Sequence, residues 1–279
     1  MVQKENDGVK PPFLTFVKDL MKYINLWWIL TLNAAQITIA SRFGALIFLL
    51  GKFLRFGFFF FFLSVLLSRA NNLAGYNATQ VFFFYLSFNL IDSIPQLLFR
   101  EVYRFRQQVL SGSFDYYLVK PISVLFRSLF GGSDLLDIPL TIIIIVLLFI
   151  VGAHLHGITL LTVFAYICLL INAIFIATAF HIGVLCLGVL TTEVDNAIML
   201  YRDFTQMGRF PIDIYKEPLR GVLTFIIPVG IMMTVPPKVL MGIFTWNIVA
   251  ISFTIGIILF LFSVFLWKYA LRTYASASS

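Results

Sequence analysis

Charged residues are scarce in this sequence. They make up 12% of its 279 residues, whereas about 25% is usual for soluble domains. Hydrophobic residues reach 60%, against roughly 45–50% in such domains. A water-soluble globular fold is therefore excluded. Since a membrane-spanning helix needs about 20 apolar residues, the chain is long enough for six spans and their loops.

Cysteine and histidine are scarce as well. Cys168 and Cys186 both lie inside apolar runs, and their spacing corresponds to about 27 Å along one helix, so they cannot pair within it. His154, His156 and His181 have no acidic or sulfur neighbour at the spacing of metal ligands. We expect neither a disulfide framework nor a metal site.

The sequence also lacks the motifs of common catalytic sites. It contains no GxxxxGK[ST] phosphate-binding loop, no HExxH and no GxSxG. No carboxylate pair has the neighbours that general acid–base catalysis requires. We therefore expect a non-catalytic chain that holds no cofactor of its own.

The basic residues follow a pattern typical of membrane topology. The net charge is +7, yet no Lys or Arg falls between Ser128 and Tyr201, and the basic residues gather mainly in 4–55, 100–127 and the C-terminal tail. Cytoplasmic loops carry such an excess, so both termini and 100–127 are predicted to be cytoplasmic. A nucleic-acid partner is not expected.

The apolar runs predict one all-α membrane domain over residues 1–279. Six spans are expected, at 43–68, 79–98, 134–152, 158–190, 192–210 and 244–267. Before them, Lys18, Lys22 and Asn25 share one helical face within 13–41, and Trp27-Trp28 marks its boundary. This pattern favours an N-terminal amphipathic interfacial helix over a poorly apolar span at 23–41.

Two arrangements suit the region before the last span. In one, 193–216 is a cytoplasmic helix and 219–235 is the fifth span, which obeys the positive-inside rule. In the other, 192–210 crosses the membrane and 217–243 forms an external re-entrant pair. Both arrangements end with a cytoplasmic C-terminus.

Charges inside the expected spans indicate a polar layer. Lys52 and Arg55 share a face of the first span, and Asp92 lies in the second. An ionisable group at membrane depth costs a few kcal/mol or more unless it is paired. We expect Asp92 to pair with one of these cations, although both cations could instead snorkel from a tilted helix. The candidate residues for a substrate path or dimer seam are Arg55, Asp92, Tyr201, Arg202 and Asp203.

The polar stretch 100–127 is a candidate docking region for a partner protein. Apolar residues alternate there with basic ones, and the stretch continues into the aromatic and acidic string SFDYYLVKP. The alternative is an ordinary solvated loop. The candidate coupling residues are Arg104, Arg106, Phe114, Asp115 and Tyr116.

Three strings carry a resemblance to a known family. They are LAGYNATQVFFFYLSFNLIDSIPQLLFREVYRFR at 73–106, LSGSFDYYLVKPISVLFR at 110–127 and GRFPIDIYKEPLRGVLTFIIPVGIMMTVPPKVLMG at 208–242. Together they resemble the ABC-2 family of ABC-transporter permeases, in particular the six-span exporter subunits that pair with a separate ATPase. The resemblance implies an external re-entrant element at 217–243, which would place Arg209, Lys216, Arg220 and Lys238 outside, against the positive-inside rule.

The same resemblance implies partners and a mechanism. It assigns 100–127 to the region that touches the ATPase subunit, which would bind ATP and Mg. The permease would form a dimer in the bacterial inner membrane, with itself or with a related permease, and the substrate path would lie between the two copies in contact with lipid. Exported compounds would be hydrophobic or amphiphilic, such as a drug, an organic cation or a lipid-like molecule. A different hypothesis is an ATPase-independent channel or a proton-coupled carrier.

Overall fold

The computed structural model describes residues 12–70, 72–191 and 194–274. Within these ranges the regular elements are helices, and no strand forms, which confirms the all-α class. Among the described residues, five helices are long and apolar enough to cross a membrane. They are α2 (Arg42–Arg69), α3 (Ala78–Leu98), α7 (Ile138–Gly152) with the preceding turn η2 (Leu135–Asp137), α8 (Leu160–Thr191) and α12 (Trp246–Thr273).

Local chemistry explains where these helices begin and why they are helical. The Asn77 side chain accepts from the backbone N–H of Gln80, and the Gln80 side chain accepts from the N–H of Asn77, so a capping box starts α3. The run of isoleucines in α7 is β-branched and disfavours a helix in water. In lipid each backbone group must be satisfied within its own segment, so the same run forms a spanning helix.

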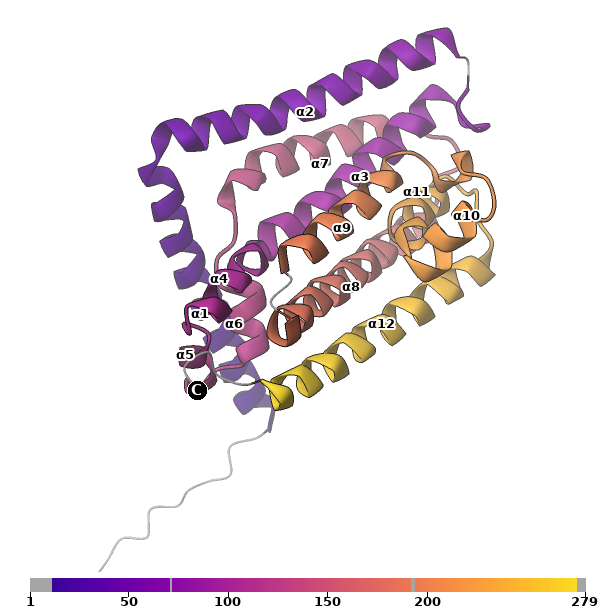
Figure 1. Ribbon diagram of the computed structural model, residues 1–279. Helices are drawn as coiled ribbons and strands as arrows, with labels where there is room; N and C mark the ends of the chain where they lie inside the picture. Colours follow the sequence, from indigo (N-terminus) through magenta and orange to yellow (C-terminus); the bar gives the residue numbers. More distant parts are fainter. Residues whose placement is uncertain (1–11, 71, 192–193, 275–279) are drawn as a thin grey trace, which may run out of the picture.

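Helix α8 is the centre of the bundle. It packs against α12 along most of its length and also against α3 and α11 (Val235–Leu240), and the long helices run in the same general direction (Figure 1). Gly256 of α12 leaves room for the buried Asn172 of α8, whose Nδ2 donates to the carbonyl of Ser252 at 2.9 Å. A small residue thus lets two spans approach closely around one interhelical hydrogen bond.

The α4–α6 end is the end of the bundle that carries the short helices. They are η1 (Arg100–Arg104), α4 (Phe105–Leu110), α5 (Asp115–Leu118) and α6 (Val124–Phe130). Tyr274 directly follows α12 and is the last residue that the structure describes. Its hydroxyl group donates a hydrogen bond to Asp115 at 2.9 Å. The end of α12 therefore lies beside α5, as Figure 1 also shows.

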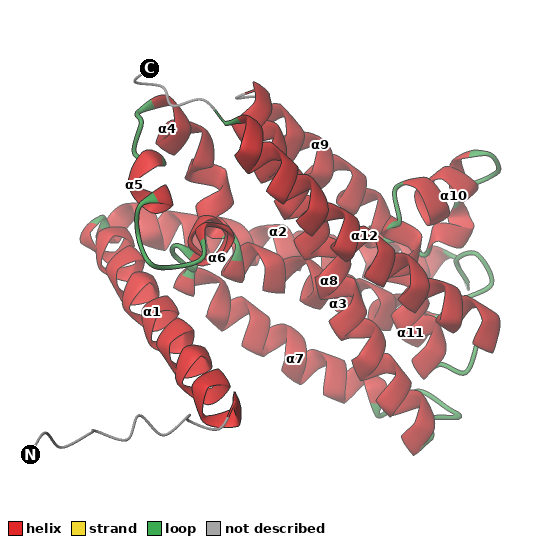
Figure 2. Cartoon of the chain, turned by 90° about the horizontal axis from the view of Figure 1, so that it is seen from below, coloured by secondary structure: helices red, strands yellow, loops and turns green. Residues whose placement is uncertain are grey.

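Helix α1 (Pro12–Ala40) lies at the same end, beside the bundle rather than within it (Figures 1 and 2). Trp27 donates its indole N–H to Ser133 at 2.9 Å, and Tyr23 accepts from the backbone N–H of Ser123 at 3.1 Å. Helix α1 is not among the candidate spans. Its assignment as an interfacial helix stays a prediction.

The segment after α8 runs from one end of the bundle to the other. It consists of α9 (Val194–Gln206), η3 (Met207–Arg209) and η4 (Ile212–Ile214). At its start Asp195 pairs with Arg106 of α4 at 2.8 Å. At its finish Asp213 accepts from Tyr76, in the turn between α2 and α3, at 2.8 Å. Residues 192–193 of the expected fifth span lie outside the described residues, and α9 is not itself a candidate span.

The elements after η4 form two limbs, and both limbs have a residue that contacts Asp213. One limb holds α10 (Leu219–Gly221) and the π-helix η5 (Val222–Ile226), and the other holds the π-helix η6 (Gly230–Thr234) and α11, with a bend of 82° between the limbs. Pro228 interrupts the helix at the bend because it lacks an N–H. Arg220 of the first limb and Lys238 of the second both bind Asp213, at 2.9 and 2.5 Å. A bend of this size occurs both in a broken span and in a re-entrant loop, so the fifth span at 219–235 and the external re-entrant element at 217–243 both stay predictions. We call the two limbs the re-entrant pair as a name only.

Candidate functional site

Glu101 is the buried acidic centre of the α4–α6 end. It is 4% exposed, and its Oε1 accepts from Arg127 at 3.0 Å and from Gln108 at 2.6 Å, while Arg104 lies 3.6 Å from Oε2. A buried carboxylate persists only when it is paired and hydrogen-bonded. One side chain therefore fastens η1, α4 and α6 into a single unit.

Phe114 is fully buried in the same unit. Its ring makes edge contacts with Phe105 and with Tyr274, both at 5.1 Å between centroids, and it lies against Trp267 of α12. The turn before it needs Gly112, whose φ of +71° is unfavourable for other residues. Phe114 was predicted among the coupling residues, but it is not on a surface that a second chain can touch. Its role is to hold α4 and α5 against α12.

Three apolar side chains on α4, on α5 and directly after α5 are exposed. Tyr116 is 68% exposed and Val119 is 81% exposed, and Leu110 is also mostly exposed. Arg104 and Arg106, half-exposed, lie on the adjoining elements. Leu110 and Val119 were not among the predicted coupling residues. Their one indication in the sequence is that each is an apolar residue in a polar stretch. We name Leu110, Tyr116 and Val119 the apical patch.

Lys52 lies at the boundary of the α4–α6 end. It binds the carboxylate of Asp137, and its Nζ is 3.7 Å from Asp134, which also lies 3.7 Å from Nε of Arg100. The expected pair between Lys52 and Asp92 is therefore not formed. The reason is that Lys52 on α2 stands level with the start of α7, where both carboxylates are found.

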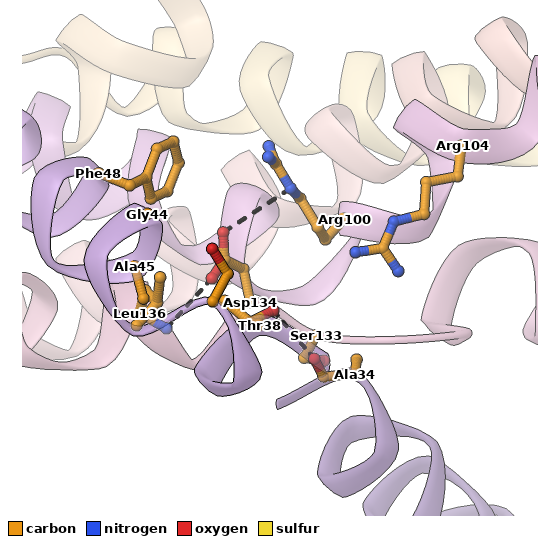
Figure 3. A pocket seen from close by; sticks show the side chains of 11 residues that line it. Ala34, Thr38, Gly44, Ala45, Phe48, Arg100, Arg104, Ser133, Asp134 and Leu136 are labelled. Atoms are coloured by element: carbon orange, nitrogen blue, oxygen red, sulfur yellow. Dashed lines mark hydrogen bonds and ion pairs between the residues drawn. The ribbon is translucent and has the colours of Figure 1, made fainter. Parts of the chain in front are cut away.

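A cavity of about 280 Å³ is lined in part by Asp134, one of the two carboxylates near Lys52. The bend between α1 and α2 forms one wall, and Ser133 and Asp134 form the other. Figure 3 shows Arg100 and Arg104 beside this cavity, with Arg100 joined to Asp134. Two guanidinium groups and a carboxylate are the charged groups of a lining that is otherwise largely apolar.

The residues predicted for the path lie around α3 and α9. Asp92 accepts a hydrogen bond from Gln96 of its own helix at 2.7 Å. The charges of Arg55 and Arg202 are near enough to influence its carboxylate. Among the described residues, however, neither guanidinium lies within 4.0 Å of that carboxylate. The ring of Tyr201 packs edge-on against His181 of α8 at 5.0 Å. The structure thus brings Arg55, Asp92, Tyr201 and Arg202 into one region. The side chain of Asp203, in contrast, is exposed.

Asp213 is the centre of a second charged cluster, at the far end from α4–α6. Burial by itself would raise its pKa, but hydrogen bonds from Lys238 and Tyr76 and the charges of Lys238 and Arg220 outweigh burial and lower the pKa below its usual range. Burial has the largest effect on Tyr76 and raises its pKa, and the hydrogen bond to Asp213 raises this pKa further. Sequence reasoning missed Asp213, because its partners are contributed by three separate segments.

Replacing Asp213 with asparagine is expected to lower the free energy of unfolding by about 1–3 kcal/mol at pH 7, because two cations lose their charged acceptor. Since the folded-state pKa of Asp213 is lowered, its stabilisation is complete above the usual value of about 3.9 and is lost as the pH falls through the folded-state value. Thermal unfolding of wild type and variant from pH 7 to pH 3 checks this. The two midpoints should converge only below about pH 4, and a constant difference would contradict the account.

The described residues offer no metal or disulfide site. No group of three His, Cys, Asp or Glu side chains is close enough in them to hold a metal ion. Cys168 and Cys186 are both free thiols.

Comparison with known proteins identifies the family. The family model described as ABC-2 family transporter protein matches residues 53–278. Neither the search of curated proteins nor the search of solved structures gave a significant match. The family match includes the long helices from most of α2 to α12, the α4–α6 end and the re-entrant pair. The chain therefore belongs to the ABC-2 family of transporter proteins.

Proposed function

We propose that this chain is the permease subunit of an ATP-driven ABC exporter and that a separate ATPase subunit docks on its α4–α6 end. Family membership makes it a membrane transport component. The observation that carries the proposal is the apical patch, in which Leu110, Tyr116 and Val119 are exposed at the end of the bundle rather than along its sides. Apolar side chains grouped on such a surface with basic neighbours are typical of a protein–protein contact.

The buried groups beneath the apical patch support a coupling role. Glu101 ties α4 and α6 to the end of α3 through η1, and Phe114 ties α4 and α5 to α12. A displacement of the patch is therefore transmitted to α3 and α12 by a closely packed unit. Because the sequence has no phosphate-binding loop, ATP and Mg would be bound by the partner.

The topology in this proposal places the α4–α6 end in the cytoplasm of a bacterium and the re-entrant pair outside its inner membrane. Helix α1 and the end of α12 lie at the α4–α6 end, so both termini are proposed to be cytoplasmic. Arg220 and Lys238 would then be external, against the positive-inside rule. Both are paired with Asp213, whose negative charge offsets part of their positive charge.

A dimer would supply the second wall of the substrate path. Helix α2 leaves most of its apolar side chains exposed, among them Phe43, Ile47, Phe58 and Phe61. This surface would be covered by lipid and by a second permease, identical or related. It lies next to Arg55 and to Asp92 of α3, which we assign to the path or the dimer seam together with Tyr201, Arg202 and Asp203.

Affinity purification from native membranes in mild detergent tests the proposal. We expect the wild-type protein to recover a P-loop ATPase and nucleotide hydrolysis, because the apical patch and its basic neighbours are intact. Charge reversal of Arg104 and Arg106, or Val119→Asp, should reduce recovery at least tenfold, since each places a negative charge on the contact. Val119→Asp alters no buried group, so a loss cannot be ascribed to unfolding.

Arg69→Glu is the matched control, because Arg69 is exposed at the opposite end of α2. It should recover the ATPase as the wild type does. An eluate that lacks ATPase yet transports after reconstitution would overturn the proposal in favour of an ATPase-independent channel or a proton-coupled carrier.

A further inference from the structure

Three arginines gather around one carboxylate where α2, α3 and the segment after α8 meet. Arg209 of η3 has its guanidinium 5.1 Å from the ring centroid of Phe59 in α2. The same ring stacks on Tyr85 of α3 at 4.9 Å. Arg55 lies one helical turn from Phe59, and Asp92 lies two turns from Tyr85. Arg55 and Asp92 are therefore nearer to the α4–α6 end than the Phe59–Tyr85 contact is, and they lie on the same faces of α2 and α3 as that contact.

Arg202 completes the group, which we name the arginine cluster: Arg55, Arg202 and Arg209. It precedes Arg209 by seven residues on the segment that runs along α3. All three arginines act electrostatically on the Asp92 carboxylate, and Arg55 and Arg209 also repel each other. These mutual effects place the four charged groups in one neighbourhood.

Arg55 and Asp92 lie inside the level at which the apolar helix α7 begins. The backbone N–H of Asp134 donates to the carbonyl of Leu97 at 3.0 Å, and Lys52 binds Asp137, so these contacts mark the level at which α7 begins. At 1.5 Å per residue, Arg55 is about 4–5 Å above that level and Asp92 about 7–8 Å above it. An apolar layer is about 30 Å thick, which puts both residues in its half nearer the α4–α6 end.

The charges of this region do not balance. In the part of the chain that the structure describes, no arginine of the cluster has a carboxylate within 4.0 Å, and Asp92 is hydrogen-bonded to Gln96. Counting the exposed Asp203 as well still leaves three cations and two anions. A guanidinium in the apolar layer is costly without a counter-charge. A second copy across a two-fold seam would bring the same excess and cannot neutralise it.

We propose that the arginine cluster binds the phosphate or carboxylate headgroup of an amphiphile, so that the transported compound is an anionic amphiphile rather than an organic cation. Arginine binds both groups through paired N–H donors. The exposed phenylalanines of α2, such as Phe58 and Phe61, offer an apolar surface for the tail. The inference rests on the proposed transport role, because it assigns the cluster to the substrate path.

Binding of radiolabelled dodecyl phosphate to the full-length protein in nanodiscs of phosphatidylcholine tests this inference. We expect dodecyl phosphate to bind at least tenfold more tightly than dodecyltrimethylammonium. Arg55→Gln and Arg209→Gln should each weaken dodecyl phosphate binding about tenfold, which is the effect of losing one charge-assisted hydrogen bond. Arg209→Lys should lose less binding than Arg209→Gln, because it keeps the charge but not the paired N–H donors, and Arg69→Gln, on the same helix as Arg55, should not change it.

Equal affinity for the two detergents, or unchanged binding in Arg55→Gln and Arg209→Gln, would overturn the inference. So would displacement by inorganic phosphate at the concentration of the labelled probe, because the tail would then contribute nothing. Displacement by phosphatidylglycerol would support it and identify a membrane lipid as an occupant. The assay uses no ATPase, so a failure to purify an ATPase and a failure to bind the anion are separate results.

Discussion

Replacing Glu101 with alanine is expected to lower the free energy of unfolding by about 3–5 kcal/mol, which is the usual cost of removing one partner from a buried ion pair. The carboxylate accepts from Arg127 and Gln108 and lies near Arg104. Its loss leaves Arg127, which is mostly buried, without a counter-charge. Thermal unfolding of the purified protein measures the effect, expected as a fall in midpoint of about 6–15 °C.

Asp195→Ala is the matched control for Glu101→Ala. Asp195 also pairs with an arginine at the α4–α6 end, Arg106 at 2.8 Å, but both side chains are about half-exposed. An exposed pair contributes about 0.2–1 kcal/mol, so the midpoint should hardly move. Equal losses in the two variants would show that Glu101 is not the centre of the α4–α6 end.

Gly256→Ala is expected to lower the free energy of unfolding by about 2–4 kcal/mol. A Cβ at position 256 would lie 2.0 Å from Oδ1 of Asn172, so either α12 must move away from α8 or the amide must turn. Turning the amide breaks its hydrogen bond to the Ser252 carbonyl and leaves a buried polar group unsatisfied. Moving the helices apart disturbs packing along both spans. The midpoint of thermal unfolding checks this prediction.

Gly183→Ala tests whether the effect at Gly256 is specific. Gly183 lies within α8, and no atom lies within 4 Å of the position that its Cβ would take. The substitution should be neutral or slightly stabilising, because alanine favours a helix over glycine. A loss as large as that of Gly256→Ala would contradict close packing at the α8–α12 contact as its cause.

Three carboxylates fasten the parts of the chain that lie outside the apolar layer or at its boundary. Glu101 joins the short helices of the α4–α6 end, Asp137 joins α7 to α2 through Lys52, and Asp213 joins the two limbs of the re-entrant pair to the α2–α3 turn. Glu101 and Asp213 each have at least two polar partners, and Asp137 has Lys52, which is 85 residues away in the sequence. Within the bundle the spans meet through apolar contacts, small residues and a few interhelical hydrogen bonds such as that of Asn172 to Ser252.

The sequence predicted the helical class and the apolar runs well, because run length and apolarity directly reflect the thickness of the membrane. It predicted partners poorly. Lys52 has two acidic neighbours in space, Asp134 and Asp137, yet periodicity ranked Asp92 higher because it lies inside a span. Pairing depends on the level at which helices stand beside one another, and spacing along one chain does not contain that information.

The coupling residues show the same limit at the level of single side chains. Amphipathic spacing predicted a docking region at 100–127, and the structure folds this stretch into short helices. The spacing did not separate Phe114, which is buried against Trp267, from Tyr116 two residues later, which is exposed. The difference arises from the turn at Gly112 and from the end of α12, which approaches α5 from more than a hundred residues away.

Site-specific photo-crosslinking in native membranes is the most direct test of the central claim, that a separate ATPase docks on the α4–α6 end. A photoreactive residue at position 119 should form a covalent product with a P-loop ATPase that mass spectrometry identifies, because Val119 is 81% exposed in the apical patch. The same residue at position 160 should not, although Leu160 is 88% exposed, because it lies at the opposite end of α8. An ATPase captured from position 160 but not from position 119 would contradict the account.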